Sequence, residues 1–266
     1  MKNLTKEDLT FFFLLLPSIL TLFYILPLQL KELFILSKCN PTILSIYFSS
    51  FIHIDFKHFL GNLTGYLLII FLILNIETKK ERLYIFTIFS LLILPFLTSF
   101  SFLFLATSYV YTLGFSNIVS AFSSYLLYSL FTSLKKIQKD LSLSFYIYLI
   151  TISVFITIIA IFTSKSIFIF SISYFILFSI FEFRELKNIS KAVYKKLLKL
   201  KKESLTSAFF KITTAALAIT LAIFSLPILI PLKANGINIL SHYIGYLFGV
   251  VLAPLLDKLI FKKEKH

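Results

Sequence analysis

The chain has 266 residues, of which 58% are hydrophobic and only 14% are charged. This composition excludes a soluble globular protein and predicts an all-α fold, a polytopic membrane helix bundle. The formal net charge of +14 is compatible with nucleic-acid binding until the basic residues are placed relative to the apolar runs. Cys39 is the single cysteine, which excludes an internal disulfide framework and a thiolate metal cluster.

Eight apolar runs are long enough, or nearly so, to cross a hydrocarbon core of ~30 Å as helices. In chain order the predicted spans are 10–30, 57–76, 83–105, 113–132, 144–163, 166–181, 208–232 and 239–256. The first run lacks a small-x-small cleavage site and has acidic residues beside its lysines, so we expect it to remain as a span.

The basic residues alternate between the two ends of these spans. Of the 26 Lys and Arg residues, 21 fall in the segments 1–9, 77–82, 133–142, 182–211 and 257–266. By the positive-inside rule these segments are cytoplasmic, so both termini are expected in the cytoplasm. The charge therefore sets topology, and we expect no nucleic-acid partner but an integral protein of a prokaryotic plasma membrane.

We predict a single membrane-embedded domain over residues 1–266, in which 144–206 is an insertion. The insertion would comprise a helical hairpin and a basic amphipathic cytoplasmic helix over 182–206. One face of that helix is apolar and lysines cover the rest, a pattern typical of a helix lying on an anionic lipid surface. The apolar positions are Leu186, Ile189, Val193, Leu197 and Leu200.

Three polar clusters stand at the outer ends of predicted spans, where ionisable groups are functional candidates. In the first, HIDFKHFLGN (53–62), His58 and Asn62 are four residues apart and share a helix face. Both can donate hydrogen bonds to a developing oxyanion. His53 lies off that face, so we expect it in a supporting place in the preceding loop.

The second and third clusters supply a hydroxyl and an imidazole on helices that can approach closely. Ser116 follows Gly114 by two residues in a chain with only six glycines, and Ser116, Ser120 and Ser124 form one small-residue face. Residues 242–249 place His242, Gly245 and Gly249 on one face, with a Gly-xxx-Gly packing motif. If these faces pack together, His242 can act as the base that activates Ser116.

In this order, His53-x4-His58-x3-Asn62, Gly114-x-Ser116 and His242-x2-Gly245-x3-Gly249 resemble the rhomboid family of intramembrane serine proteases. The resemblance covers spans 1–4 and 7–8. It implies a six-span core carrying the inserted hairpin, about eight spans in all. It also implies Ser116 as nucleophile, His242 as general base, and Asn62, His58 and the Ser116 backbone N–H as the oxyanion hole.

The chain departs from the family pattern at several positions. Asn117 follows the nucleophile where the family usually has Gly, and Ser120 replaces an aromatic residue that supports the base. Leu44 and Ser45 stand at the spacing of a Trp-Arg pair. These departures bear on rate and substrate preference.

The resemblance implies hydrolysis of transmembrane segments of membrane protein substrates within the lipid bilayer, without a cofactor or metal. Span 7 would be the gate for lateral entry, and Pro227 and Pro231 weaken its outer end. Three other functions stay open from the residues alone. They are a non-proteolytic rhomboid-like protein that binds transmembrane clients, a metal or haem site on three histidines, and a transporter.

Overall fold

The computed structural model describes residues 4–77, 79–106, 110–161, 172–173, 176–177, 179–200, 205–229 and 239–260. Most of the predicted sixth span, 166–181, lies outside these residues, as do Pro231 and His266. The chain divides into two compact units. Unit 1 consists of Met1–Leu74, Lys79–Tyr125 and Lys233–His266, and unit 2 consists of Asn75–Thr78 and Leu126–Leu232.

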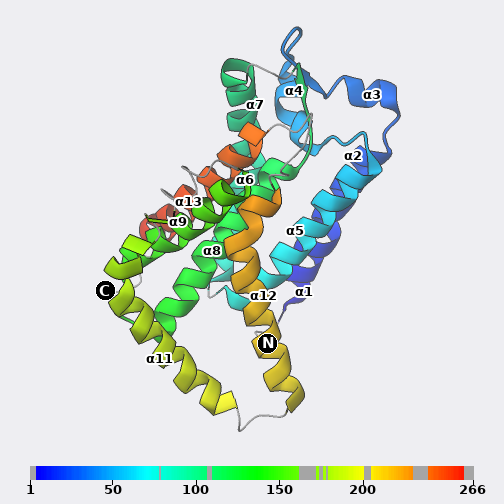
Figure 1. The fold of residues 1–266 in the computed structure, drawn as a ribbon. Coiled ribbons are helices and arrows are strands. Elements are labelled where there is room, and N and C mark those ends of the chain that lie inside the picture. Colours follow the sequence, from blue (N-terminus) through cyan, green and yellow to red (C-terminus); the bar gives the residue numbers. More distant parts are fainter. Residues whose placement is uncertain are drawn as a thin grey trace. The chain divides into compact units, whose positions relative to one another are not determined.

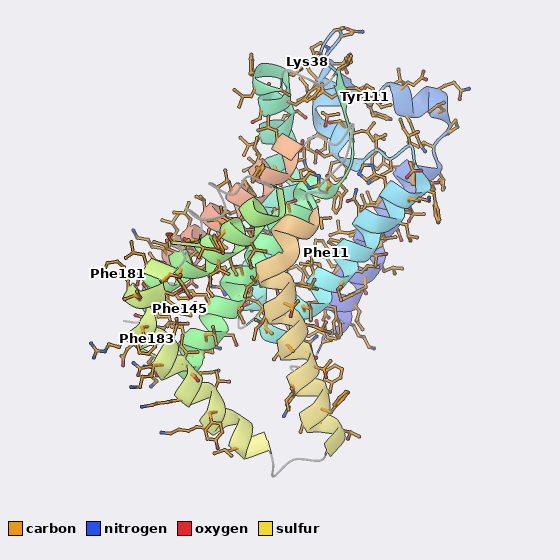
Figure 2. The ribbon with its side chains drawn as sticks, in the orientation of Figure 1. Phe11, Lys38, Tyr111, Phe145, Phe181 and Phe183 are labelled. Carbon is orange, nitrogen blue, oxygen red and sulfur yellow. The ribbon has the colours of Figure 1, made fainter. Side chains whose placement is uncertain are left out.

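Unit 1 contains most of the helices shown in Figure 1 and one short pair of strands. Its elements are α1 (Lys6–Asp8), η1 (Leu9–Leu15), α2 (Leu16–Ile25), α3 (Leu28–Glu32), β1 (Leu36–Ser37), α4 (Ile43–Phe48), η2 (Ser49–Phe51), most of α5 (Phe56–Ile76), α6 (Lys80–Leu92), α7 (Leu94–Leu105), β2 (Tyr111–Thr112), the first part of α8 (Ser116–Ile137) and α13 (Ile239–Leu259). Strands β1 and β2 pair antiparallel, with Ser37 opposite Tyr111, and Figure 2 labels Lys38 and Tyr111 at this pair. The pair was not predicted from the sequence.

Among the residues that the structure describes, five helices are long and apolar enough to cross a membrane, which agrees with an integral membrane protein. They are Lys6–Ile25, Phe56–Ile76, Lys80–Leu105, Thr206–Ile223 and Leu240–Leu259. The prediction of 10–30 for the first span was wrong at both ends. A capping box between Thr5 and Asp8 starts the helix earlier, and Leu26 leaves the helical conformation just before Pro27.

Helix α8 is not among those five, although we predicted a span over 113–132. Its repeated serines lower its hydropathy, yet every residue from Gly114 to Phe131 is buried. Ser120 and Ser123 satisfy their hydroxyls by donating to the backbone carbonyls four residues earlier. A helix shielded by its neighbours can therefore be less apolar than one that faces lipid.

Ion pairs join the helices of unit 1 near the start of α6. Asp8 accepts hydrogen bonds from Lys80 and from the Tyr84 hydroxyl, which ties the first helix to α6. Arg82, which is almost fully buried, contacts Asp257 of α13 at 2.9 Å. Figure 1 shows α5 running beside α1 and α2, and there the Tyr66 hydroxyl donates to the carbonyl of Phe12 at 3.1 Å.

Unit 2 contains the end of α8, α9 (Leu143–Ile161), α11 (Phe183–Leu200) and α12 (Leu205–Leu229), with α9 packed against α12. It thus includes the predicted insertion and also the predicted gate helix, which continues through Pro227. Phe181 and Phe183 at the start of α11 are exposed (Figure 2). Along α11 the lysines 187, 191 and 195 are exposed and the apolar positions 186, 189 and 193 are half-buried.

Candidate active site

The nucleophile candidate Ser116 is the first residue of α8. It follows a tight turn whose backbone at position 114 favours glycine. Gly114 has φ +114°, a conformation that residues with a side chain rarely adopt. A Cβ on Gly114 would also lie 2.6 Å from Cε1 of His58. The turn is held by the Gly114 N–H, which donates to the Ser49 carbonyl at 2.9 Å. Because Ser116 opens the helix, its own N–H has no acceptor within α8.

Helix α13 lies directly against the backbone of α8 through its two glycines. A Cβ on Gly245 would lie 2.0 Å from the carbonyl oxygen of Asn117. A Cβ on Gly249 would lie 2.1 Å from Oγ of Ser124 and 2.4 Å from the carbonyl oxygen of Ala121. The two helices therefore approach as closely as the Gly-xxx-Gly motif predicts, and the contact begins beside Ser116.

This close contact places the imidazole of His242 one helical turn from the start of α8. Nδ1 of His242 is 3.4 Å from Oγ of Ser120, and that hydroxyl donates to the carbonyl of Ser116 at 2.8 Å. Ser116 and His242 are buried, with 8% and 5% of their surfaces exposed. In the part of the chain that is described, no hydrogen bond joins the side chains of Ser116 and His242 themselves. Catalytic hydrogen bonds are often long before substrate binds.

His53 lies in the loop before α5 and holds the side chain of Asn62. The Asn62 amide donates through Nδ2 to Nε2 of His53 at 2.8 Å, and the Phe115 N–H also points at Nε2, at 3.4 Å. Burial, with a smaller contribution from the nearby His58, lowers the pKa of His53 to about 3. Its imidazole is therefore neutral near pH 7 and accepts these hydrogen bonds through Nε2.

His58 differs from its predicted partner Asn62 in exposure. The Asp55 carboxylate caps the start of α5 by accepting from the His58 N–H at 2.8 Å. The His58 ring is exposed and lies beside Gly114, with its centroid 5.0 Å from that of His53. Asn62 is buried, with 7% of its surface exposed. Four of the predicted site residues therefore lie around the turn that leads into α8. They are His53, His58, Asn62 and Ser116.

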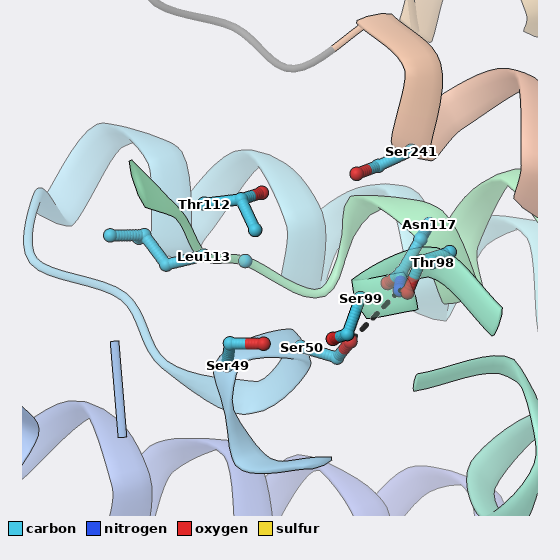
Figure 3. Close-up of a pocket in the computed structure, with 9 residues that line it drawn as sticks. Ser49, Ser50, Thr98, Ser99, Thr112, Leu113, Asn117 and Ser241 are labelled. Atoms are coloured by element: carbon cyan, nitrogen blue, oxygen red, sulfur yellow. Dashed lines mark hydrogen bonds between the residues drawn. The ribbon is translucent and has the colours of Figure 1, made fainter. Parts of the chain in front are cut away.

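A small polar pocket, with room for about one water molecule, lies beside this turn (Figure 3). Its lining residues are Ser49, Ser50, Thr98, Ser99, Thr112, Leu113, Gly114, Asn117 and Ser241. Asn117 is central, because its amide donates to the hydroxyls of Ser50 at 2.9 Å and Thr98 at 2.8 Å. The pocket is therefore built from hydroxyl and amide groups, which can hold water.

The pocket was not predicted from the sequence, although the polar residues that line it stand out there. Ser49-Ser50 and Thr98-Ser99 are the polar pairs that meet there, each within an otherwise apolar segment. Nothing in their spacing indicated that they meet Asn117. Among the residues that are described, no group of three or more His, Cys, Asp or Glu side chains is arranged to hold a metal ion.

No known protein family, curated protein or solved structure matches this chain. The class that the fold defines is a helical membrane protein, and any finer assignment depends on the geometry of the site.

Proposed function

We propose that the protein is an intramembrane serine endopeptidase of the rhomboid type, which cleaves transmembrane segments through a Ser116–His242 dyad. The observation that carries the proposal is the glycine-mediated contact of α13 with the start of α8. Through this contact the imidazole of His242 lies 3.4 Å from the hydroxyl of Ser120. That hydroxyl donates to the backbone carbonyl of Ser116, the buried first residue of α8. A serine beside a histidine is the pairing that activates a hydroxyl for attack on a carbonyl.

The surrounding groups support this chemistry. The N–H of Ser116, which has no acceptor within α8, the Asn62 amide and the imidazole of His58 can all donate near the same turn, as an oxyanion hole requires. The Asn62 amide has two N–H groups and gives one to His53, and since the described residues give the second no acceptor, it can stabilise developing charge. Hydrolysis within a bilayer also needs water, and the polar pocket beside Asn117 has hydroxyl and amide partners and room for about one water molecule.

Serine-directed fluorophosphonate labelling tests this function on the purified full-length protein in detergent. We expect covalent labelling of the parent, loss of labelling in Ser116→Ala, and full labelling of Ser101→Ala, whose half-buried serine lies on α7. Equal labelling of the Ser116→Ala variant would reject Ser116 as nucleophile. A parent that takes up no label would favour the alternative, a rhomboid-like protein that binds transmembrane clients without cleaving them.

The oxyanion hole predicts a large effect at Asn62. Asn62→Ala should lower turnover of a transmembrane substrate by about 10²–10³, the usual loss for one such donor. Thr64→Ala, an exposed residue two positions later on the same helix, should keep full turnover. If Asn62 only packs α5, the substitution would change the thermal midpoint and leave the turnover of the folded enzyme as it was.

We propose that cleavage takes place near the outer face of the membrane, and the native cysteine can test this orientation. Cys39 is exposed between β1 and α4, in the connection that the charge pattern assigns to the outer surface. On intact cells it should react with an impermeant thiol reagent. In a Cys39→Ser background, Lys195→Cys on α11 should react only after the cells are opened. Reversed labelling would turn the site towards the cytoplasm.

A further inference from the structure

Ser120 lies between the two members of the proposed dyad and belongs to neither. Its side chain is fully buried, and its Oγ is 2.8 Å from the carbonyl oxygen of Ser116 and 3.4 Å from Nδ1 of His242. Ser123, one turn further along α8, makes the same kind of bond to the carbonyl of Val119, at 2.9 Å, and among the described residues it makes no hydrogen bond to a histidine. The contact with His242 is therefore a property of position 120 and not of buried serines on this helix.

The direction of the hydrogen bonds follows from counting protons. A serine hydroxyl has one proton, and a carbonyl oxygen can only accept, so the proton of Ser120 is directed at the Ser116 carbonyl. With its proton held by the shorter bond to the Ser116 carbonyl, Oγ can only accept from His242, and that contact then uses a proton on Nδ1. A neutral imidazole with its proton on Nδ1 carries its lone pair on Nε2, the nitrogen left free to act as a base.

We propose that Ser120 is a positioning residue that fixes the tautomer and the ring orientation of His242. This inference rests on the proposed function, because it assigns to Ser120 the role that a buried carboxylate has in a Ser-His-Asp triad. A hydroxyl is neutral, so it orients the ring with little added stabilisation of the imidazolium. It also gives a physical reason why a small polar residue stands where the resemblance leads one to expect an aromatic one.

The rate of fluorophosphonate labelling tests the role in the full-length protein. Ser120→Ala should lower the second-order rate constant by about 10- to 100-fold, the loss that follows when a histidine loses its orienting partner. Ser120→Thr keeps the hydroxyl and its bond to the Ser116 carbonyl and should recover most of the rate. Ser123→Ala removes a matched buried hydroxyl and should label as the parent does. An unchanged rate in Ser120→Ala would overturn the proposal.

A spectroscopic readout separates this inference from the proteolytic function. In protein labelled with ¹⁵N-histidine, the His242 signals, assigned by their loss in His242→Ala, should show a protonated Nδ1 and an unprotonated Nε2. Ser120→Ala should mix the two tautomers, whereas Ser123→Ala should not. If the parent resists fluorophosphonate but shows this change, the positioning role stands and the protease assignment fails. If the tautomer in Ser120→Ala is that of the parent, the positioning role fails whatever the activity.

Discussion

Ser116→Ala and His242→Ala should each abolish cleavage of a reporter with a single transmembrane helix. Both variants should still purify as folded proteins. Nucleophile and base act as one unit, so either loss removes the covalent step altogether. The double variant should consequently be scarcely slower than either single variant, since rates of groups that act together are far from additive. Cleavage of the reporter in proteoliposomes, compared across the three variants, measures this.

The control for this experiment is a serine that shares the local chemistry but not the location. Ser101→Ala removes a hydroxyl bonded to the carbonyl of Leu97 at 2.7 Å, at a half-buried position of α7, and should cleave at the parental rate. The thermal midpoint of Ser116→Ala should lie close to that of the parent, because the Ser116 side chain makes no hydrogen bond within the described residues. Additive losses in the double variant would show that the two residues act separately.

The helices were largely predictable from the sequence because a membrane imposes one length and one composition on them. The predicted span 57–76 corresponds to α5 (Phe56–Ile76), and 239–256 falls within α13 (Ile239–Leu259). The ends were less predictable, since they depend on local caps such as Asp55 for α5. The helix α8 was predicted as a span over 113–132 from its long, largely apolar run. Its serine-rich composition reflects burial among other helices and not exposure to lipid.

The components of the candidate site were predictable, but its hydrogen bonds were not. Scarce glycines marked Gly114, Gly245 and Gly249, and a positive φ or a close backbone approach explains each of them. The Asn62–His53 bond and the Ser120–His242 contact join residues 9 and 122 positions apart. The first depends on the path of the loop before α5 and the second on how α8 and α13 rotate against each other, and periodicity within a single helix carries no information on either.

The proposed mechanism depends on the approach of α13 to α8, so Gly245 should be the most sensitive position outside the dyad. Gly245→Val should lower cleavage steeply while the protein remains folded. The atom that a new Cβ would meet, at 2.0 Å, is the backbone carbonyl oxygen of Asn117, which cannot rotate away as a side chain can. The helices must separate instead, at a cost of ~1–3 kcal/mol for an overpacked interface.

Separation of the helices would lengthen the contact between Ser120 and His242, which at 3.4 Å is already a long hydrogen bond. Gly245→Ala should therefore already reduce cleavage, and Gly245→Val should reduce it further. Gly61 is the matched control, because a Cβ there would meet nothing within 4 Å. Gly61→Val in α5 should cleave normally. Parental activity in Gly245→Val, or equal losses at Gly245 and Gly61, would mean that the serine and histidine do not rely on this contact, and the dyad assignment would then fail.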